Sequence, residues 1–336
     1  MKTTEVAARI KGKFNGLLAA TAVLALGAGS ASAEEVLRAV TAFPTPMFWS
    51  QDFSKYVDKV NEKGEGIVRI DIMGGPEVFP PMQQVDAVSR GIVDIQYGPA
   101  TYHLGKVPEI DALVGSNVST ETVRKNGGLD LLQGVFEEKL GVRLMAVTQS
   151  GLQFHVWTVN EPKISEDGEV DLDGMRLRSQ PIYQAFFEGM NAVPVSVPVP
   201  DVYTGLERHT FEGVGWPVAG VSDFSWDKFL KYRIDPGFFN TDLVIVMNPD
   251  TFEGLSDEAK AILSEAAVEY EIESSDRLAK ITAETDAAVR EKGVEVITLE
   301  GEAAKAYLDT AYGSAWSRLE TSGSPLYEEL RAKFYD

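Results

Sequence analysis

The sequence predicts an α/β protein of two lobes, and three observations lead to this fold class. Segments that alternate apolar and polar residues recur between segments with helical spacing, in strand–helix–strand order with short connections. The 336 residues suffice for two hydrophobic cores. The stretch between Gly254 and Gly293 contains neither glycine nor proline, which predicts one helix of about 55 Å, too long for a single lobe.

The first lobe is expected at residues 34–152 plus about 241–280. It should open with a strand in EEVLRAVTAFP and an amphipathic helix in FWSQDFSKYVDKVNEKG. Further strands are expected in IVRIDIM and IVDIQYG, with a helix in MQQVDAVSRG between them. A single helix is expected from TVRKNGGLDLLQGVFEEKLG, followed by a strand in VRLMAVTQSG.

The second lobe is expected at about 153–240 plus about 281–336, including the C-terminal helices. Its strands should include FHVWTVN and MRLRS, and a helix should follow in PIYQAFFEGM. LVIVMN predicts a buried strand just after the chain returns to the first lobe near 240–243. Ser256 is the expected N-cap of the long helix, which should cross both lobes and lead to a strand in VEVITL.

Residues 1–33 have the pattern of a secretory signal peptide. Basic residues precede the apolar run GLLAATAVLALGAG, and the small-residue site ASA ends at Ala33. The apolar run is shorter than the ~20 residues that a membrane-spanning helix requires, which disfavours an anchor. We therefore expect a periplasmic protein that is exported and then cleaved after Ala33.

The composition excludes several classes of function. The chain has no cysteine, which rules out disulfides, thiol catalysis and thiolate metal sites. The formal net charge of −20 argues against nucleic acid and anionic membrane as partners. HExxH, P-loop and G-x-S-x-G motifs are missing, and His103, His155 and His209 are not at metal-ligand spacing. The sequence favours a binding protein over an enzyme and offers no catalytic residues.

The stretch DGMRLRSQPIYQAFFEGM places two arginines on a strand that otherwise looks buried. Arg178 is expected at the carboxyl end of that strand, just before a helix that starts near Pro181, whereas Arg176 lies further back. Ligands of parallel α/β sheets bind beyond this end of the strands. The guanidinium of Arg178 could pair bidentately with a carboxylate. That carboxylate could belong to a ligand or to the protein itself, and the residue types leave both alternatives open.

These residues resemble DctP-type substrate-binding proteins of tripartite ATP-independent periplasmic (TRAP) transporters. DLDGMRLRS matches the family motif D-L-x-G-x-[KR]-[ILV]-R, whose last arginine, here Arg178, binds the ligand carboxylate. Two further matches are PVPVPDVYTGLERHTFEGVGWP and MGGPEVFPPMQQVDAVSRGIVDI. The resemblance covers residues 34–320. It implies the two-lobed periplasmic-binding-protein fold, with a hinge and mixed sheets.

The chain looks most similar to the branch of this family that binds 2-oxo acids and related monocarboxylates. Gln153 in SGLQF and Trp216 in GVGWP match two ligand-contacting positions of that branch. Gly215 stands where the branch has a metal-ligating glutamate, so no cofactor is expected and a bridging cation is in doubt. The second arginine that many members carry near Gln153 is missing, which disfavours a dicarboxylate or sialic acid.

The remaining candidate ligand contacts are aromatic. Trp49, Tyr97 and Tyr102 are expected on the wall contributed by the first lobe, whereas Tyr183 and Phe239 belong to aromatic-rich segments of the second. Together with Arg178, they suit a pocket with one carboxylate anchor and a largely apolar wall.

The resemblance implies an extracytoplasmic solute-binding protein. It would capture a small organic acid in the interlobe cleft and deliver it to the permease subunits of a TRAP transporter. A periplasmic ligand-sensing receptor is the alternative, followed by a hydrolase or lyase acting on an organic acid. The sequence leaves open the identity of the acid, the presence of a bridging metal, a homodimer, and the roles of His155 and His209.

Overall fold

A computed structural model of the chain describes residues 34–148 and 151–336. The signal peptide expected at residues 1–33, with its cleavage site after Ala33, lies outside the described residues. Within the two described ranges, none of the helices combines the length and the apolar character that crossing a membrane requires.

The first lobe is built on a five-stranded mixed sheet with the order β2-β1-β3-β12-β4. β1 pairs in parallel with β2 and β3, whereas β12 runs antiparallel to β3 and β4. The strands are β1 (Glu35–Thr41), β2 (Val68–Gly74), β3 (Ile95–Pro99), β4 (Arg143–Thr148) and β12 (Leu243–Met247). Since parallel neighbours need crossover connections, helices separate β1 from β2 and β2 from β3 along the chain.

The helices between these strands are short, apart from the first and the fifth. They are α1 (Phe48–Lys63), α2 (Pro81–Ser89), α3 (Asp111–Val114), α4 (Thr120–Lys125), α5 (Gly128–Leu140) and α8 (Pro249–Gly254). The single helix expected from TVRKNGGLDLLQGVFEEKLG is wrong, because the chain breaks between α4 and α5. Gly127 has φ +81°, a left-handed conformation that ends one helix and lets the next start in another direction.

The second lobe is built on a six-stranded mixed sheet with the order β13-β11-β5-β10-β8-β9. β5 runs antiparallel to β11 and β10, while β10, β8 and β9 are parallel to one another. The strands are β5 (Gln153–Thr158), β8 (Arg176–Ser179), β9 (Val193–Ser196), β10 (Gly213–Pro217), β11 (Tyr232–Asn240) and β13 (Glu295–Thr298); β6 (Lys163–Ile164) and β7 (Val170–Asp171) form a separate small ribbon. Two mixed sheets confirm the fold class predicted from the sequence.

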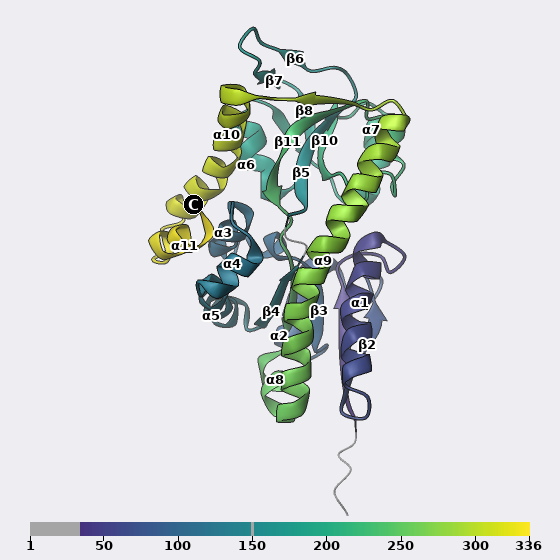
Figure 1. Cartoon of the computed structure of the whole chain (residues 1–336), viewed down its shortest axis with the longest axis vertical. Helices are drawn as coiled ribbons and strands as arrows, with labels where there is room; N and C mark the ends of the chain where they lie inside the picture. Colours follow the sequence, from purple (N-terminus) through teal and green to yellow (C-terminus); the bar gives the residue numbers. More distant parts are fainter. Residues whose placement is uncertain (1–33, 149–150) are drawn as a thin grey trace, which may run out of the picture. The chain divides into compact units, whose positions relative to one another are not determined.

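The long helix is confirmed as α9 (Asp257–Glu291), 35 residues in length. The Ser256 hydroxyl caps it by accepting a hydrogen bond from the amide of Ala259. α9 packs against α1 and β4 of the first lobe and leads into β13 of the second, so it runs alongside both sheets (Figure 1).

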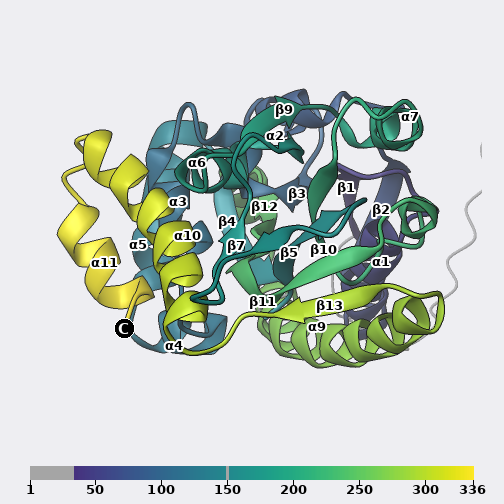
Figure 2. The same ribbon diagram turned by 90° about the horizontal axis from the view of Figure 1, so that it is seen from above.

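The chain passes from the first sheet to the second between β4 and β5, and it returns between β11 and β12. The other helices are α6 (Pro181–Gly189), α7 (Val202–Glu207), α10 (Gly301–Thr321) and α11 (Tyr327–Phe334). α10 packs on α6 and β11, whereas α11 packs on α3 and α5 of the first lobe (Figure 2). The exact lobe boundaries given by the sequence stay a proposal.

Candidate functional site

Arg178 lies near the end of β8, where it pairs with Val214 of β10 and Val195 of β9. The residue is 0% exposed. Its Nε donates a hydrogen bond to the carbonyl of Val197 at 2.9 Å, and its Nη1 donates one to the hydroxyl of Tyr183 at 2.8 Å. Both partners are neutral, and Nη2 has no hydrogen-bond partner within the described residues. A buried guanidinium without a counter-ion is energetically costly. Neither the carbonyl of Val197 nor the hydroxyl of Tyr183 is an anion, so these contacts do not balance the charge of Arg178.

Arg176, two residues earlier on the same strand, has a different environment. Its side chain is exposed; it donates a hydrogen bond to the carbonyl of His209 and lies 3.7 Å from a carboxylate oxygen of Glu212. The pairing of an exposed arginine with a carboxylate at the surface contributes little to stability. The two arginines therefore differ in burial and in partners.

Tyr183 connects Arg178 to the neighbouring strand. α6 begins at Pro181, directly after β8, and its first turn brings the Tyr183 hydroxyl back over the strands. This hydroxyl accepts the hydrogen bond from Arg178 and donates one to the carbonyl of Gly215 at 2.8 Å. Burial raises the pKa of Tyr183, although the charge of Arg178 opposes the shift. The hydroxyl therefore stays protonated and keeps donating.

A cavity of about 40 Å³, which we call the inner cavity, lies between the two lobes beside this network. A cavity of this size accommodates a few water-sized groups. Its walls include Phe43, Trp49, Thr101 and Tyr102 of the first lobe, Thr241 and Asp242 at the crossing between β11 and β12, and Phe154, Gln180 and Trp216 of the second lobe. Arg178 itself is one side chain away, with its guanidinium carbon 5.8 Å from the centroid of the Trp216 ring.

Two tryptophans, one from each lobe, line the inner cavity. Trp49 begins the first turn of α1 and stacks on Phe43, with ring centroids 5.8 Å apart. Trp216 comes from β10 and packs edge-on against Trp226. The indole nitrogens of Trp49 and Trp216 are both buried, and neither has a hydrogen-bond partner in the part of the chain that the structure describes. A buried indole N–H usually donates to an acceptor. These two N–H groups, like Nη2 of Arg178, are therefore donors whose acceptor is not among the described residues.

Asp242 and Tyr102 add polar groups to the same cavity. A carboxylate oxygen of Asp242 accepts a hydrogen bond from the amide of Thr101 at 2.5 Å. Burial raises the pKa of Asp242, against the lowering effect of its hydrogen bonds with Thr101. Burial also raises the pKa of Tyr102 to about 12; the charge of Asp242 adds to this shift, and that of Arg178 opposes it. The field of Arg178 therefore reaches the cavity wall, and the Tyr102 hydroxyl is a donor at neutral pH.

The sequence did not single out Asp242, Thr101 or Gln180 as site residues. A signal for Asp242 was present, because it directly precedes the buried strand β12, at the point where the chain crosses between the lobes. Thr101 and Gln180 had no such signal. They lie on short segments after β3 and β8, and only the folded chain brings these segments to one cavity.

Gln153 does not line the inner cavity. Side chains alternate between the two faces of β5, so that Phe154 faces the inner cavity and Gln153 lies elsewhere. Gln153 instead lines a separate hollow of about 480 Å³ together with Asn240 and Tyr312. A hydrogen bond from Gln153 lowers the pKa of Tyr312, although burial raises it more.

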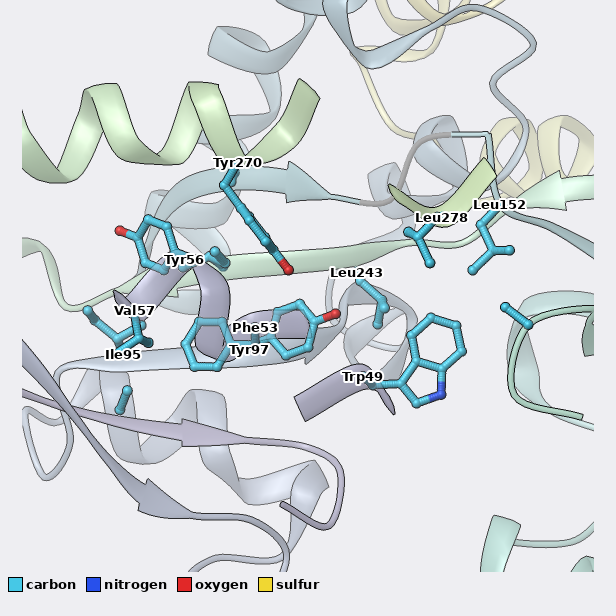
Figure 3. Close-up of a cluster of buried hydrophobic side chains, with 14 of the residues drawn as sticks. Trp49, Phe53, Tyr56, Val57, Ile95, Tyr97, Leu152, Leu243, Tyr270 and Leu278 are labelled. Carbon is cyan, nitrogen blue, oxygen red and sulfur yellow. The ribbon is translucent and has the colours of Figure 1, made fainter. Parts of the chain in front are cut away.

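Tyr97 and Phe239 also lie outside the inner cavity. Tyr97 is stacked on Phe53 with ring centroids 4.8 Å apart, inside the cluster of buried side chains that also holds Tyr270 (Figure 3). Phe239 is buried between Phe186 and Tyr312. Of the candidate residues, Trp49, Tyr102 and Trp216 line the inner cavity. Arg178 lies against Trp216, and Tyr183 is hydrogen-bonded to Arg178, so both lie beside the cavity rather than in its wall.

The residues at the site do not fit a metal ligand at position 215. A Cβ added to Gly215 would lie 2.8 Å from the ring of Tyr183 and 3.1 Å from that of Phe187. A glutamate there would collide with the tyrosine that holds Arg178. Within residues 34–148 and 151–336, no three acidic, histidine or cysteine side chains are grouped as a metal site requires.

Comparison with known proteins places this geometry in a family. Residues 40–320 match DctP, described as bacterial extracellular solute-binding protein, family 7. A curated relative is the 2,3-diketo-L-gulonate-binding periplasmic protein YiaO of Escherichia coli (strain K12). It is 24% identical over 255 residues, which cover 73% of this chain and 75% of that protein.

Solved structures with the same fold are also found. DctP7, a Bordetella pertussis extracytoplasmic solute receptor that binds pyroglutamic acid, superposes with a TM-score of 0.76 at 18% identity, covering 89% of this chain and 99% of that one. A TRAP transporter solute-binding protein from Bordetella bronchiseptica RB50 superposes with a TM-score of 0.77 at 19% identity, covering 90% of this chain and 91% of that one. That protein is a mixed-occupancy dimer with copurified calcium and picolinate in one active site.

The family and the two-lobed fold predicted from the sequence motifs are therefore confirmed. The match extends over most of the described residues and includes the strand that carries Arg178. The chain belongs to DctP, family 7 of the bacterial extracellular solute-binding proteins.

Proposed function

We infer that this protein captures a small organic acid in the cleft between its lobes and delivers it to the permease subunits of a TRAP transporter. The observation that carries the inference is the environment of Arg178. It is a fully buried arginine with two neutral partners and one unpartnered nitrogen. A ligand carboxylate would supply both the missing charge and the missing acceptor.

The relatives support a carboxylate as the bound group. The ligands named for them are 2,3-diketo-L-gulonate, pyroglutamic acid and picolinate, and each of these carries a carboxylate. The three relatives share between 18% and 24% identity with this chain, so the chemical class is a better guide than any single compound.

The two lobes would hold the acid jointly. Trp49 of the first lobe and Trp216 of the second line the inner cavity, and the guanidinium of Arg178 lies against the ring of Trp216. Because Arg178 is fully buried, contact between a ligand and its Nη2 requires the site to open, which a hinged two-lobed protein allows. A ligand that bonds to both lobes then stabilises the closed arrangement.

Binding in this proposal uses no metal and no catalytic residue. Tyr183 occupies the space that a side chain at position 215 would need, and its hydroxyl fixes Nη1 of Arg178. The mature protein is proposed to act in the periplasm after cleavage at Ala33. Size-exclusion chromatography with light scattering of the mature protein tests for a homodimer, because it separates a species with the mass of one chain from one of twice that mass.

A thermal-shift screen against organic acids tests the proposal. A carboxylate at 100 times its Kd should stabilise the folded protein by about 2.7 kcal/mol and raise its Tm. Arg178→Gln should abolish the shift, whereas the matched control Arg176→Gln, on the exposed part of the same strand, should retain it. The proposal is wrong if no carboxylate raises the Tm of the unmodified protein, or if Arg178→Gln still responds.

A further inference from the structure

A second hollow adjoins the inner cavity, and we call it the outer groove. Its volume is about 660 Å³. Phe43, Tyr102, Gln180 and Val199 line both hollows, so the inner cavity and the outer groove are adjacent parts of one cleft. The outer groove provides the room that the inner cavity lacks.

The walls of the outer groove come from both lobes. Residues 42–47 follow β1, and residues 76–82 follow β2, two parallel strands of the first sheet. Residues 179–181 start at the last residue of β8, and residues 196–200 start at the last residue of β9; these are two parallel strands of the second sheet. All four segments lie at the carboxyl ends of parallel strands, which is where α/β proteins bind their ligands.

These walls are apolar and poor in hydrogen-bond donors. The groove is lined by six prolines: Pro44, Pro76, Pro81, Pro181, Pro198 and Pro200. Proline has no backbone N–H, so each of these positions removes a donor as well as adding apolar surface. Met47, Met82 and Phe224 extend the apolar surface, and the lining, taken from the described residues, contains no Lys, Arg, Asp or Glu.

We propose that the ligand is a monocarboxylate with an apolar body. Its carboxylate would lie at the inner cavity toward Arg178, and its aliphatic or aromatic body would fill the outer groove. This statement rests on the proposed function and specifies the class of acid. A sugar acid would lose hydrogen bonds to water at each hydroxyl buried in the groove, and a second carboxylate would meet no cation there.

A series of straight-chain acids measures the contribution of the groove. Burial of each methylene group should tighten binding about fourfold, so that hexanoate should bind about 15-fold more tightly than butyrate. Gluconate has the same six carbons as hexanoate and carries five hydroxyl groups. Hexanoate should therefore have a Kd at least about tenfold lower than that of gluconate when both are measured by isothermal titration calorimetry.

One variant tests the groove itself. Met82 is 57% exposed on α2 and lines the groove, so Met82→Gln makes the wall polar without disturbing the core. Hexanoate binding should weaken about fourfold, and acetate binding should not change. The matched control is Met73→Gln, an exposed methionine on β2 outside the groove, which should leave both affinities unchanged.

The outcomes separate this proposal from the proposed function. If gluconate binds as tightly as hexanoate, and Arg178→Gln abolishes both, the apolar class is overturned and carboxylate capture stands. If affinity does not rise from butyrate to hexanoate, or if Met82→Gln has no effect on hexanoate, the groove does not hold the ligand body and the proposal is overturned. If no acid of the series binds while another carboxylate raises the Tm in the thermal-shift screen, the apolar class is overturned and carboxylate capture stands; if no carboxylate raises the Tm, both are rejected.

Discussion

Two arginines are buried in the second sheet, and their surroundings are arranged in opposite ways. Arg233 on β11 is 3% exposed, and carboxylate oxygens of Asp235 and Asp286 lie 2.9 and 2.5 Å from its guanidinium nitrogens. Arg178 on β8 is 0% exposed, and its hydrogen-bond partners are a carbonyl and a hydroxyl. Both guanidinium groups also lie over a tryptophan ring.

The comparison shows which feature distinguishes an arginine with a structural role, such as Arg233, from Arg178, which we propose to bind an anion. Arg233 has its counter-ions within the chain, so its charge is already balanced and a ligand would add nothing. Arg178 has donors in place and no counter-ion within residues 34–148 and 151–336, and we propose that an anion from outside the chain balances its charge. Burial alone would not separate the two residues, whereas the identity of their partners does.

The largest expected effect comes from exchanging the two arginines for glutamine, one at a time. Arg233→Gln leaves Asp235 and Asp286 without their shared cation and should reduce the free energy of unfolding by about 3–5 kcal/mol. Arg178→Gln removes an unbalanced charge, so without ligand its effect should be about 1 kcal/mol or less. Urea denaturation of both variants measures this, and equal losses would show that the contrast between the two regions is mistaken.

The second-largest effect is expected from a substitution beside Arg178, at Gly215. Gly215→Ala would press a methyl group against the ring of Tyr183 and should cost about 1–3 kcal/mol of stability. It should also reduce the ligand-induced rise in Tm, because the Tyr183 hydroxyl holds Arg178. Gly134→Ala in α5 is the control; its Cβ meets nothing within 4 Å, and it should stabilise the protein by about 0.5–1 kcal/mol. Similar results for the two variants would contradict this account.

The acid dependence of stability tests the Arg233 region. Burial raises the pKa of Asp235, but hydrogen bonds from His155 and Arg233 outweigh it and bring the pKa to about 2. Since the unfolded carboxyl titrates near 3.8, the stabilisation is fully present above that pKa and is lost as pH falls through about 2. The lowered pKa of Asp235 contributes about 2 kcal/mol to the free energy of unfolding at neutral pH. Denaturation of Asp235→Asn should therefore show a flatter decline in stability between about pH 5 and pH 2.

Asp242 at the inner cavity should change stability with pH in the opposite direction to Asp235. Its pKa is raised by burial, so its contribution to stability is present below the unfolded pKa and is lost as pH rises through the folded pKa. In Asp242→Asn, the free energy of unfolding should no longer fall as pH rises through the folded pKa of Asp242. If both aspartates changed the pH profile in the same direction, the charge environments of the two regions would not differ as described.

The smallest effect comes from a single oxygen atom. Tyr183→Phe leaves Nη1 of Arg178 and the carbonyl of Gly215 without a partner, which should cost about 1 kcal/mol of stability. Carboxylate binding should weaken roughly tenfold in calorimetry, since a loose guanidinium forms poorer hydrogen bonds. Tyr307→Phe removes a buried hydroxyl that has no partner and should cost nothing. Retained affinity in Tyr183→Phe would show that the hydroxyl does not position Arg178.

Features carried by local sequence were predictable. The absence of glycine and proline after Gly254 predicted α9, because helix formation depends on residues close in the chain. The position of Arg178 near the end of a strand and just before a helix was likewise predicted from neighbouring residues. The break at Gly127 was missed because a glycine inside a helical pattern does not reveal whether its φ is positive.

Only the tertiary structure decided what each side chain touches. It sends Gln153 to a hollow away from Phe154, stacks Tyr97 into the core, and brings Asp242 to the inner cavity. It also joins prolines from four distant loops into one apolar groove. The sequence by itself determined the family and most of the helices and strands, and it singled out Arg178, the residue that we propose as the anion site. The walls of the site depend on contacts between residues far apart in the chain, which no local pattern encodes.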